Sequence, residues 1–326
     1  MKHCWVFLLL LALPAGAFKL GPQSAREAAL YKTFVAGLYS QRDNSPEALV
    51  LFEKALSLAP DSAYLKRNIV ATAIMQNRLP EVEKYADFIT PEADEDDWTV
   101  RAAYLLKQQQ VPAAKEAYQK ALELSPEDAR IAYQYLLLLA YEGTPQAVEE
   151  MQNLAEKVPA LAPAVYVELG KHYWRMKDPQ QALTFYNKAT DLDPAYEDAY
   201  LGRAELFERT SNFFFMLREY EQLEKLGYQS ADMYTRMGSV YLVGKDLENA
   251  QKYYQKAAQI DPGDVNANYF LAMLAEQRQD WSQALKYLQA AADYNKNSGK
   301  WLQASFYQQK MGHSQAALDT LKQAYK

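Results

Sequence analysis

The chain has 326 residues, of which 49% are hydrophobic and 23% charged, and its formal net charge is −6 at pH 7. This apolar content is enough for a sizeable core, and the negative charge argues against a nucleic-acid partner and against binding to an anionic membrane surface. Tyrosine is unusually frequent, with 25 residues, whereas cysteine occurs once.

Residues 1–17 differ in composition from the rest of the chain. Lys2 precedes an unbroken apolar run at 5–13, and Ala-Gly-Ala follows at 15–17. This pattern predicts a secretory signal peptide cleaved after residue 17, because the run is too short to span a bilayer; an uncleaved membrane anchor is the alternative. Cleavage would remove Cys4, which suits an oxidising compartment. We therefore expect an exported protein, periplasmic or secreted, with no membrane-spanning segment in the mature chain.

After a lead-in at 18–28, small and large apolar residues recur along the whole chain at a constant spacing. The clearest copy is 163–196, in which Gly170 and Tyr173 lie on one stripe of a first helix, and Ala182 and Tyr186 lie on the facing stripe of a second. Small residues at Gly170 and Ala182 let the helices approach closely, and the tyrosines fill the remaining space. This spacing resembles the tetratricopeptide repeat, a helix–turn–helix unit of about 34 residues.

The resemblance implies an all-α fold, a superhelical solenoid of about nine such repeats that forms one continuous array. The predicted repeats occupy residues 29–62, 63–94, 95–128, 129–162, 163–196, 197–230, 231–264, 265–297 and 298–326. The second is the least regular, because Val70 stands where a small residue is expected. Its Pro80-Glu81-Val82 still matches the expected start of a second helix.

No convincing catalytic or metal-binding pattern occurs. The acidic run at 92–97 (EADEDD) lacks the alternating ligands and the glycine of a calcium loop, and it precedes a predicted helix whose positive end acids would stabilise. His172 and His313 lie in different repeats without metal-like spacing, and His172 is expected to be a surface imidazole. We expect no cofactor and no enzymatic activity.

The resemblance also implies a concave surface, lined by the first helices, that binds proteins or peptides. Two features would mark it, aromatic side chains and nearby cations, which together are typical of interaction hot spots; ordinary surface residues of a tyrosine-rich repeat are the alternative. The candidate residues on this surface are Tyr133, Tyr141, Lys171, Trp174, Arg175, Glu205, Arg209 and Tyr269.

Two further features predict interfaces outside that surface. Phe213 matches a position that is often apolar in the family, so Phe214 and Phe215 should lie partly outside the repeat's core, where they either contact a partner on the convex face or are covered by a loop. In the last repeat, Leu318 and Tyr325 face where a next helix would lie, so they meet solvent, a partner or a second copy.

Together these features predict a non-enzymatic exported scaffold or adaptor for protein or peptide partners. By family resemblance, its setting would be a cell-envelope assembly such as secretion, pilus or exopolysaccharide machinery. A carbohydrate-binding or polysaccharide-export module that stacks sugars on the exposed aromatics is the alternative, and an enzyme with an unrecognised site is a third reading.

Overall fold

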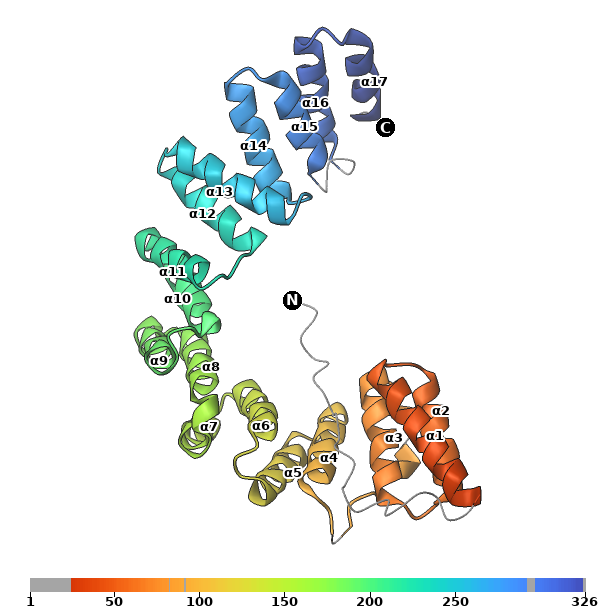
Figure 1. Cartoon of the computed structure of the whole chain (residues 1–326). Helices are drawn as coiled ribbons and strands as arrows, with labels where there is room; N and C mark the ends of the chain where they lie inside the picture. The colour runs from red at the N-terminus through yellow and green to blue at the C-terminus, as the bar shows by residue number, and fades with distance from the viewer. Residues whose placement is uncertain (1–24, 82, 91, 292–296, 325–326) are drawn as a thin grey trace. The chain divides into compact units, whose positions relative to one another are not determined.

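The computed structural model describes residues 25–81, 83–90, 92–291 and 297–324. Within these residues the chain is helical, and no β-strand occurs (Figure 1). The α-helices are α1 (Ala25–Arg42), α2 (Glu47–Leu58), α3 (Ala63–Gln76), α4 (Glu95–Lys107), α5 (Val111–Leu124), α6 (Ala129–Glu142), α7 (Pro145–Lys157), α8 (Ala162–Arg175), α9 (Pro179–Leu192), α10 (Glu197–Arg209), α11 (Phe213–Lys225), α12 (Ala231–Val243), α13 (Leu247–Ile260), α14 (Val265–Gln277), α15 (Trp281–Ala290), α16 (Ser298–Lys310) and α17 (Ser314–Ala324).

The chain divides within α8 into two compact units, Met1–Val165 and Tyr166–Lys326. In each unit the helices pack in sequential pairs, such as α4 with α5 in the first and α12 with α13 in the second. The predicted signal peptide lies outside the described residues, and so does Tyr325. Of the helices that are described, none combines the length and apolar character that a membrane span requires.

Short turns with a recurring chemistry join the two helices of a pair. In the second unit, a residue with positive φ ends each of three first helices: Lys177, Lys245 and Gln279. An aspartate follows at once and caps the next helix through a backbone N–H of its first turn: Asp178, Asp246 and Asp280. The left-handed residue reverses the chain, and the aspartate satisfies an amide that would otherwise lack a partner.

The core of the second unit depends on close contacts between tyrosine rings and glycine backbones. Tyr186 of α9 is 2% exposed. A Cβ atom added to Gly170 of α8 would lie 2.5 Å from Cε1 of this ring, and one added to Gly202 of α10 would also lie 2.5 Å from it. In the same way, a Cβ atom added to Gly238 would lie 2.9 Å from Cδ1 of the Tyr254 ring. The close helix approach predicted at Gly170 is therefore present, and Gly202 adds a second one.

The second predicted repeat differs from the expected helix pair. Between α3 and α4 the described residues form only two single-turn 3-10 helices, Leu79–Glu81 and Glu83–Tyr85. Pro80 lacks a donor for a longer helix, and Pro91 disfavours helical backbone at the residue before it. Phe88, 1% exposed, instead packs with the core residues Val70, Val100 and Tyr104. Among the described residues, the expected second helix starting at Pro80 is thus replaced by an irregular segment that Ala86 and Phe88 anchor in the core.

Candidate interaction surfaces

The candidate residues of the first unit lie on α6. Tyr133 and Tyr141 are both exposed, and Tyr141 is 79% exposed. Two turns of helix separate them, so both rings lie on one side of α6. This part of the prediction places two aromatic side chains at the surface.

The candidates on α8 do not form the exposed cationic and aromatic group that was expected. Lys171 is exposed, but its Nζ lies 2.7 Å from Oε1 of Glu168. Trp174 is half-buried and packs against the cluster that contains Tyr186 and Leu206, so the expectation of an exposed tryptophan was wrong. Partial burial against this cluster stabilises a large apolar side chain. Arg175 remains exposed.

The candidates on α10 pair with each other. Arg209 lies 4.0 Å from Glu205, one helical turn earlier, and both side chains are exposed. An exposed pair of this kind contributes little to stability, so both groups can exchange this contact for one with a partner.

An apolar surface of the first helices lies on α14 and α16. It consists of Tyr269, Met273, Leu302 and Phe306, each between 37% and 44% exposed, and we call it the apolar face. The two helices are held side by side, because Glu276 accepts hydrogen bonds from the Tyr307 hydroxyl at 2.6 Å and from Gln303 at 3.2 Å.

The apolar face follows the repeat spacing. In the predicted repeats, Tyr269 and Leu302 occupy one shared position, and Met273 and Phe306 occupy the next exposed position of the same helices. The sequence analysis selected Tyr269 of this face as a binding candidate, but neither Leu302 nor Phe306. Comparing equal positions of the last two repeats would have found Leu302 and Phe306 as well.

The three phenylalanines at the start of α11 are all exposed, Phe213 by 40%, Phe214 by 68% and Phe215 by 47%. No loop among the described residues covers them. Phe215 packs against Phe207 of α10, with ring centroids 5.2 Å apart, and meets the edge of Phe214 at 5.5 Å. Phe213 is more exposed than expected for a core position of the repeat.

A pocket of about 500 Å³ opens beside Phe215, between α9, α10 and α11. Its polar lining centres on Arg203, whose guanidinium lies 2.7 Å from Glu219 and 2.8 Å from Asn187. Burial raises the pKa of Glu219, although the charge and hydrogen bonds of Arg203 act in the opposite direction. The lining residues are Thr190, Tyr200, Arg203, Phe215, Arg218, Glu219 and Gln222.

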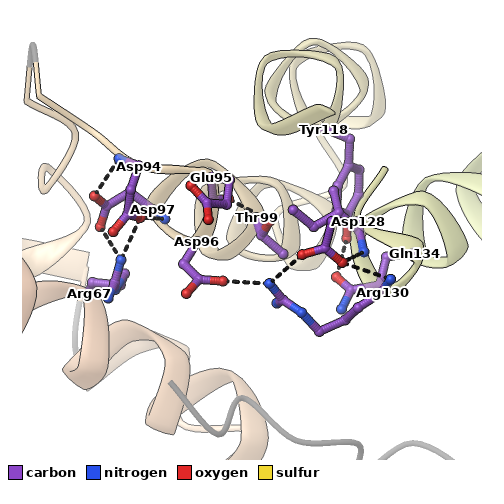
Figure 2. A network of polar contacts seen from close by, with 11 residues as sticks. Arg67, Asp94, Glu95, Asp96, Asp97, Thr99, Tyr118, Asp128, Arg130 and Gln134 are labelled. Carbon is purple, nitrogen blue, oxygen red and sulfur yellow. Dashed lines mark hydrogen bonds and ion pairs between the residues drawn. The ribbon is translucent and has the colours of Figure 1, made fainter. Parts of the chain in front are cut away.

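The acidic run forms a structural junction in the first unit, as Figure 2 shows. Asp94 and Asp97 make a reciprocal capping box at the start of α4. Arg67 of α3, whose side chain is 3% exposed, binds Asp94 at 2.7 Å and Asp97 at 3.0 Å. On the other side of the helix start, Arg130 of α6 binds Asp96 at 2.7 Å. The run thus ties three helices together, and this agrees with the structural reading of the sequence.

The titration of the two capping aspartates reflects this packing. Burial raises the pKa of Asp97 above its ordinary value. For Asp94 burial acts in the same direction, but the Asp97 backbone N–H and the Arg67 charge outweigh it, so the pKa of Asp94 is lowered. Both effects arise from contacts within the fold.

No metal site accompanies these acids in the residues that the structure describes, because no group of three His, Cys, Asp or Glu side chains could hold an ion. His172 is half-buried rather than a free surface imidazole, and its ring meets Tyr173 edge-on at 5.3 Å. Burial and the nearby Arg175 charge lower the pKa of His172.

The sequential helix pairs, closely packed on glycine and alanine, are the architecture of a repeat protein. Models of the tetratricopeptide repeat match residues 98–128, 163–196, 217–265 and 244–305, so the chain contains tetratricopeptide repeats. The C-terminal part of a TPR repeat-containing protein from Cytophaga hutchinsonii has a similar structure, with a TM-score of 0.53 and 20% identity over 73% of this chain and 99% of that chain. The all-α class of the tetratricopeptide solenoid is thereby confirmed, while the division into nine repeats stays a prediction.

Two curated proteins are similar to the chain in sequence. Stress-induced-phosphoprotein 1 of Caenorhabditis elegans is 25% identical over 239 residues, which cover 70% of this chain and 72% of that protein. Anaphase-promoting complex subunit 3 of Schizosaccharomyces pombe is 20% identical over 185 residues, which cover 57% of this chain and 28% of that subunit. Proteins built from tetratricopeptide repeats act as scaffolds for protein interactions, and such proteins are typically not enzymes.

Proposed function

We propose that this protein is a non-enzymatic scaffold or adaptor that binds peptide segments of partner proteins on its first helices. The observation that carries the proposal is the apolar face of α14 and α16. Four large apolar side chains at equal repeat positions remain about 40% exposed there. Since a fully buried aromatic side chain covers roughly 150–250 Å², covering the exposed part of Phe306 would contribute about 2 kcal/mol.

The proposal includes export to the periplasm or the outside of the cell, as part of a cell-envelope assembly. It is supported by the charge and apolar pattern of residues 1–17 and by the absence of cysteine from the rest of the chain. N-terminal sequencing of the protein purified from its own cells tests this directly. A mature chain that begins at Phe18 and fractionates outside the cytoplasm is expected; an intact N-terminus in the cytoplasmic fraction would contradict export.

Site-specific photo-crosslinking tests the binding surface. A photoreactive phenylalanine analogue replaces Leu302 or Phe306 in the full chain, and Leu192, an exposed apolar residue of the second helix α9, serves as the matched control. We expect one defined protein to be captured at both positions of the apolar face and not at the control. Met273→Ala should reduce this capture. Equal capture at all three positions would contradict a specific site on α14 and α16.

A glycan-retention assay, read together with the photo-crosslinking, tests the carbohydrate alternative. That reading requires retention of a glycan by the purified protein, with loss of retention in Tyr141→Ala. Trp174→Ala is a less selective variant, because Trp174 also packs against the core. Glycan retention that depends on Tyr141, combined with no protein captured at Leu302 or Phe306, would replace the proposed function.

A further inference from the structure

One face of the second helix α11 carries a row of exposed side chains. Phe214 and Phe215 lie at its start, and Arg218, Gln222 and Lys225 follow at successive turns. Side chains three and four residues apart are neighbours on a helix, so these five form a continuous surface, which we call the α11 row. It is separate from the apolar face and belongs to a second helix, so it does not depend on the proposed function.

The apolar end of the α11 row is both exposed and held in place. Phe214 is 68% exposed and Phe215 47%. The contact of Phe215 with Phe207 of α10 and the edge contact of Phe214 with Phe215 restrict the two rings. A partner that covers the two rings gains apolar contact. Because the rings are already restricted, binding costs little of their side-chain freedom, which favours association.

The charges inside the pocket beside these rings neutralise each other. Arg203 stacks over Tyr200, with its Cζ 4.8 Å from the ring centroid, and binds Glu219 through Nε at 3.0 Å and through Nη2 at 2.7 Å. Its Nη1 donates a hydrogen bond to Oδ1 of Asn187 at 2.8 Å. Because Arg203 and Glu219 satisfy each other, neither is available to attract a charged ligand strongly.

The cations on the rim are different. In the described part of the chain, Arg218 and Lys225 form no ion pair and no side-chain hydrogen bond, although the charge of Arg218 acts with that of Arg203 to lower the pKa of Glu219 against the effect of burial. Glu221, on the adjoining row of α11, is half-buried and pairs with neither. Glu219 and Glu224 of α11 are already paired, with Arg203 and Lys256, so the two rim cations are not cancelled by them, in a chain whose formal net charge is −6. An acidic segment would therefore be attracted to the α11 row and repelled by much of the remaining surface.

The length of the row fits a short peptide. From Phe214 to Lys225 the helix rises about 17 Å, at about 1.5 Å per residue. An extended peptide covers that distance in roughly five or six residues. Aromatic contacts are available at one end of this length, and cations at its middle and far end.

We propose that the α11 row is a second binding site, which takes a short acidic segment of a partner protein that carries an aromatic residue. The aromatic ring packs on Phe214 and Phe215 at the mouth of the pocket. The carboxylates of the segment bind Arg218 and Lys225. The site differs from the first-helix surface in both position and charge preference.

Fluorescence anisotropy with defined peptides tests this site in the full chain. The probe is a labelled hexapeptide that repeats Glu-Asp-Phe twice. Comparison peptides repeat Glu-Asp-Ala, Ser-Gly-Phe or Lys-Arg-Phe, so that charge and aromaticity vary separately. We expect the acidic aromatic peptide to bind about tenfold more tightly than any of the others, since both contacts contribute.

Substitutions locate the binding. Arg218→Glu and Phe214→Ala should each weaken the acidic aromatic peptide about tenfold or more. Both side chains are exposed, so circular dichroism should stay unchanged. The matched control is Arg278→Glu, which alters an exposed arginine elsewhere in the same unit and should leave affinity within about twofold.

Three results would overturn the proposal. One is the absence of binding by any peptide. Another is equal binding of the acidic aromatic and acidic alanine peptides, which would mean that the phenylalanines contribute nothing. The third is equal weakening by Arg218→Glu and Arg278→Glu, which would indicate non-specific attraction by surface charge.

Discussion

Gly170→Ala is the substitution that most directly tests how the second unit is packed. The added methyl group would lie 2.5 Å from Cε1 and 2.7 Å from Cδ1 of the Tyr186 ring, well inside contact distance. The ring cannot move away freely, because Gly202 approaches it from α10 at an equally short distance. Tyr186 is therefore fixed between the backbones of two helices.

The net effect depends on two opposing contributions. Replacing glycine with alanine inside a helix stabilises the helix by about 1 kcal/mol. Overpacking a close-packed core costs about 1–3 kcal/mol. Since the ring is confined on both sides, we place the cost toward the upper part of that range. The expected result is a net local destabilisation of about 1–2 kcal/mol.

Hydrogen exchange measured by mass spectrometry on the full chain is the suitable assay. In a repeat array each helix pair contacts mainly its neighbours, so a single global unfolding free energy is poorly defined. Amides of α8, α9 and α10 should lose protection by about five- to thirtyfold, while α14 to α17 keep theirs. Gly244→Ala is the matched control, because its added Cβ would meet neighbouring atoms at an ordinary 3.5 Å.

A double-substitution cycle gives the result that would refute the reasoning. In a Tyr186→Leu background the ring is absent, so Gly170→Ala should become neutral or stabilising by up to about 1 kcal/mol. If Gly170→Ala destabilises α8 to α10 equally with and without the Tyr186 ring, the proposed steric contact is not the cause.

Two further predictions concern the charged contacts of the first unit. Arg67→Met should destabilise α3 and α4 by about 3 kcal/mol, measured by pulse proteolysis, because it leaves the partly buried Asp97 without its partner. Adding Asp97→Asn to this variant should recover part of the lost stability. Unchanged proteolysis of Arg67→Met would contradict the role of the pair. Burial acts to raise the pKa of Glu150, but hydrogen bonds from Lys115 and Tyr135 outweigh it and hold this pKa below its ordinary value. The ionised Glu150 therefore stabilises the fold at neutral pH, and this stability is lost as the pH falls through the lowered pKa. Exchange in α5 to α7 followed from about pH 6 to pH 3 should show this loss, Glu150→Gln should flatten it, and the exposed Glu149→Gln should not.

The fold class was predictable because one local rule is repeated many times. Gly170, Tyr173 and Tyr186 identify two facing helical stripes within a single copy, and the same spacing then recurs along the chain. The contact between Gly170 and Tyr186 follows from that pattern and is present in the structure. The second contact, with Gly202, joins consecutive pairs, and no rule within one repeat predicts it.

The errors arise where packing overrides local pattern. Pro80 has the right spacing for a helix start, yet the chain forms single turns there and buries Phe88 instead. Trp174 has a position on the outward side of its helix, yet its large indole is half-buried against a core cluster. The acidic run was correctly read as structural, but its partner Arg67 lies on another helix, and nothing in the run itself indicates it.

The two proposed binding surfaces differ in how far the sequence predicts them. The apolar face can be derived from the sequence, because Tyr269 and Leu302 share a repeat position and a periodic fold places equal positions on one surface. The α11 row cannot be derived in this way, because it belongs to one repeat only. Its polarity depends on which cations are already paired. Arg203 is neutralised by Glu219, whereas Arg218, the residue directly before Glu219 on α11, forms no ion pair among the described residues. The sequence alone does not show which of the two arginines is already paired. Their contacts in the structure leave Arg218, and not Arg203, available to a partner.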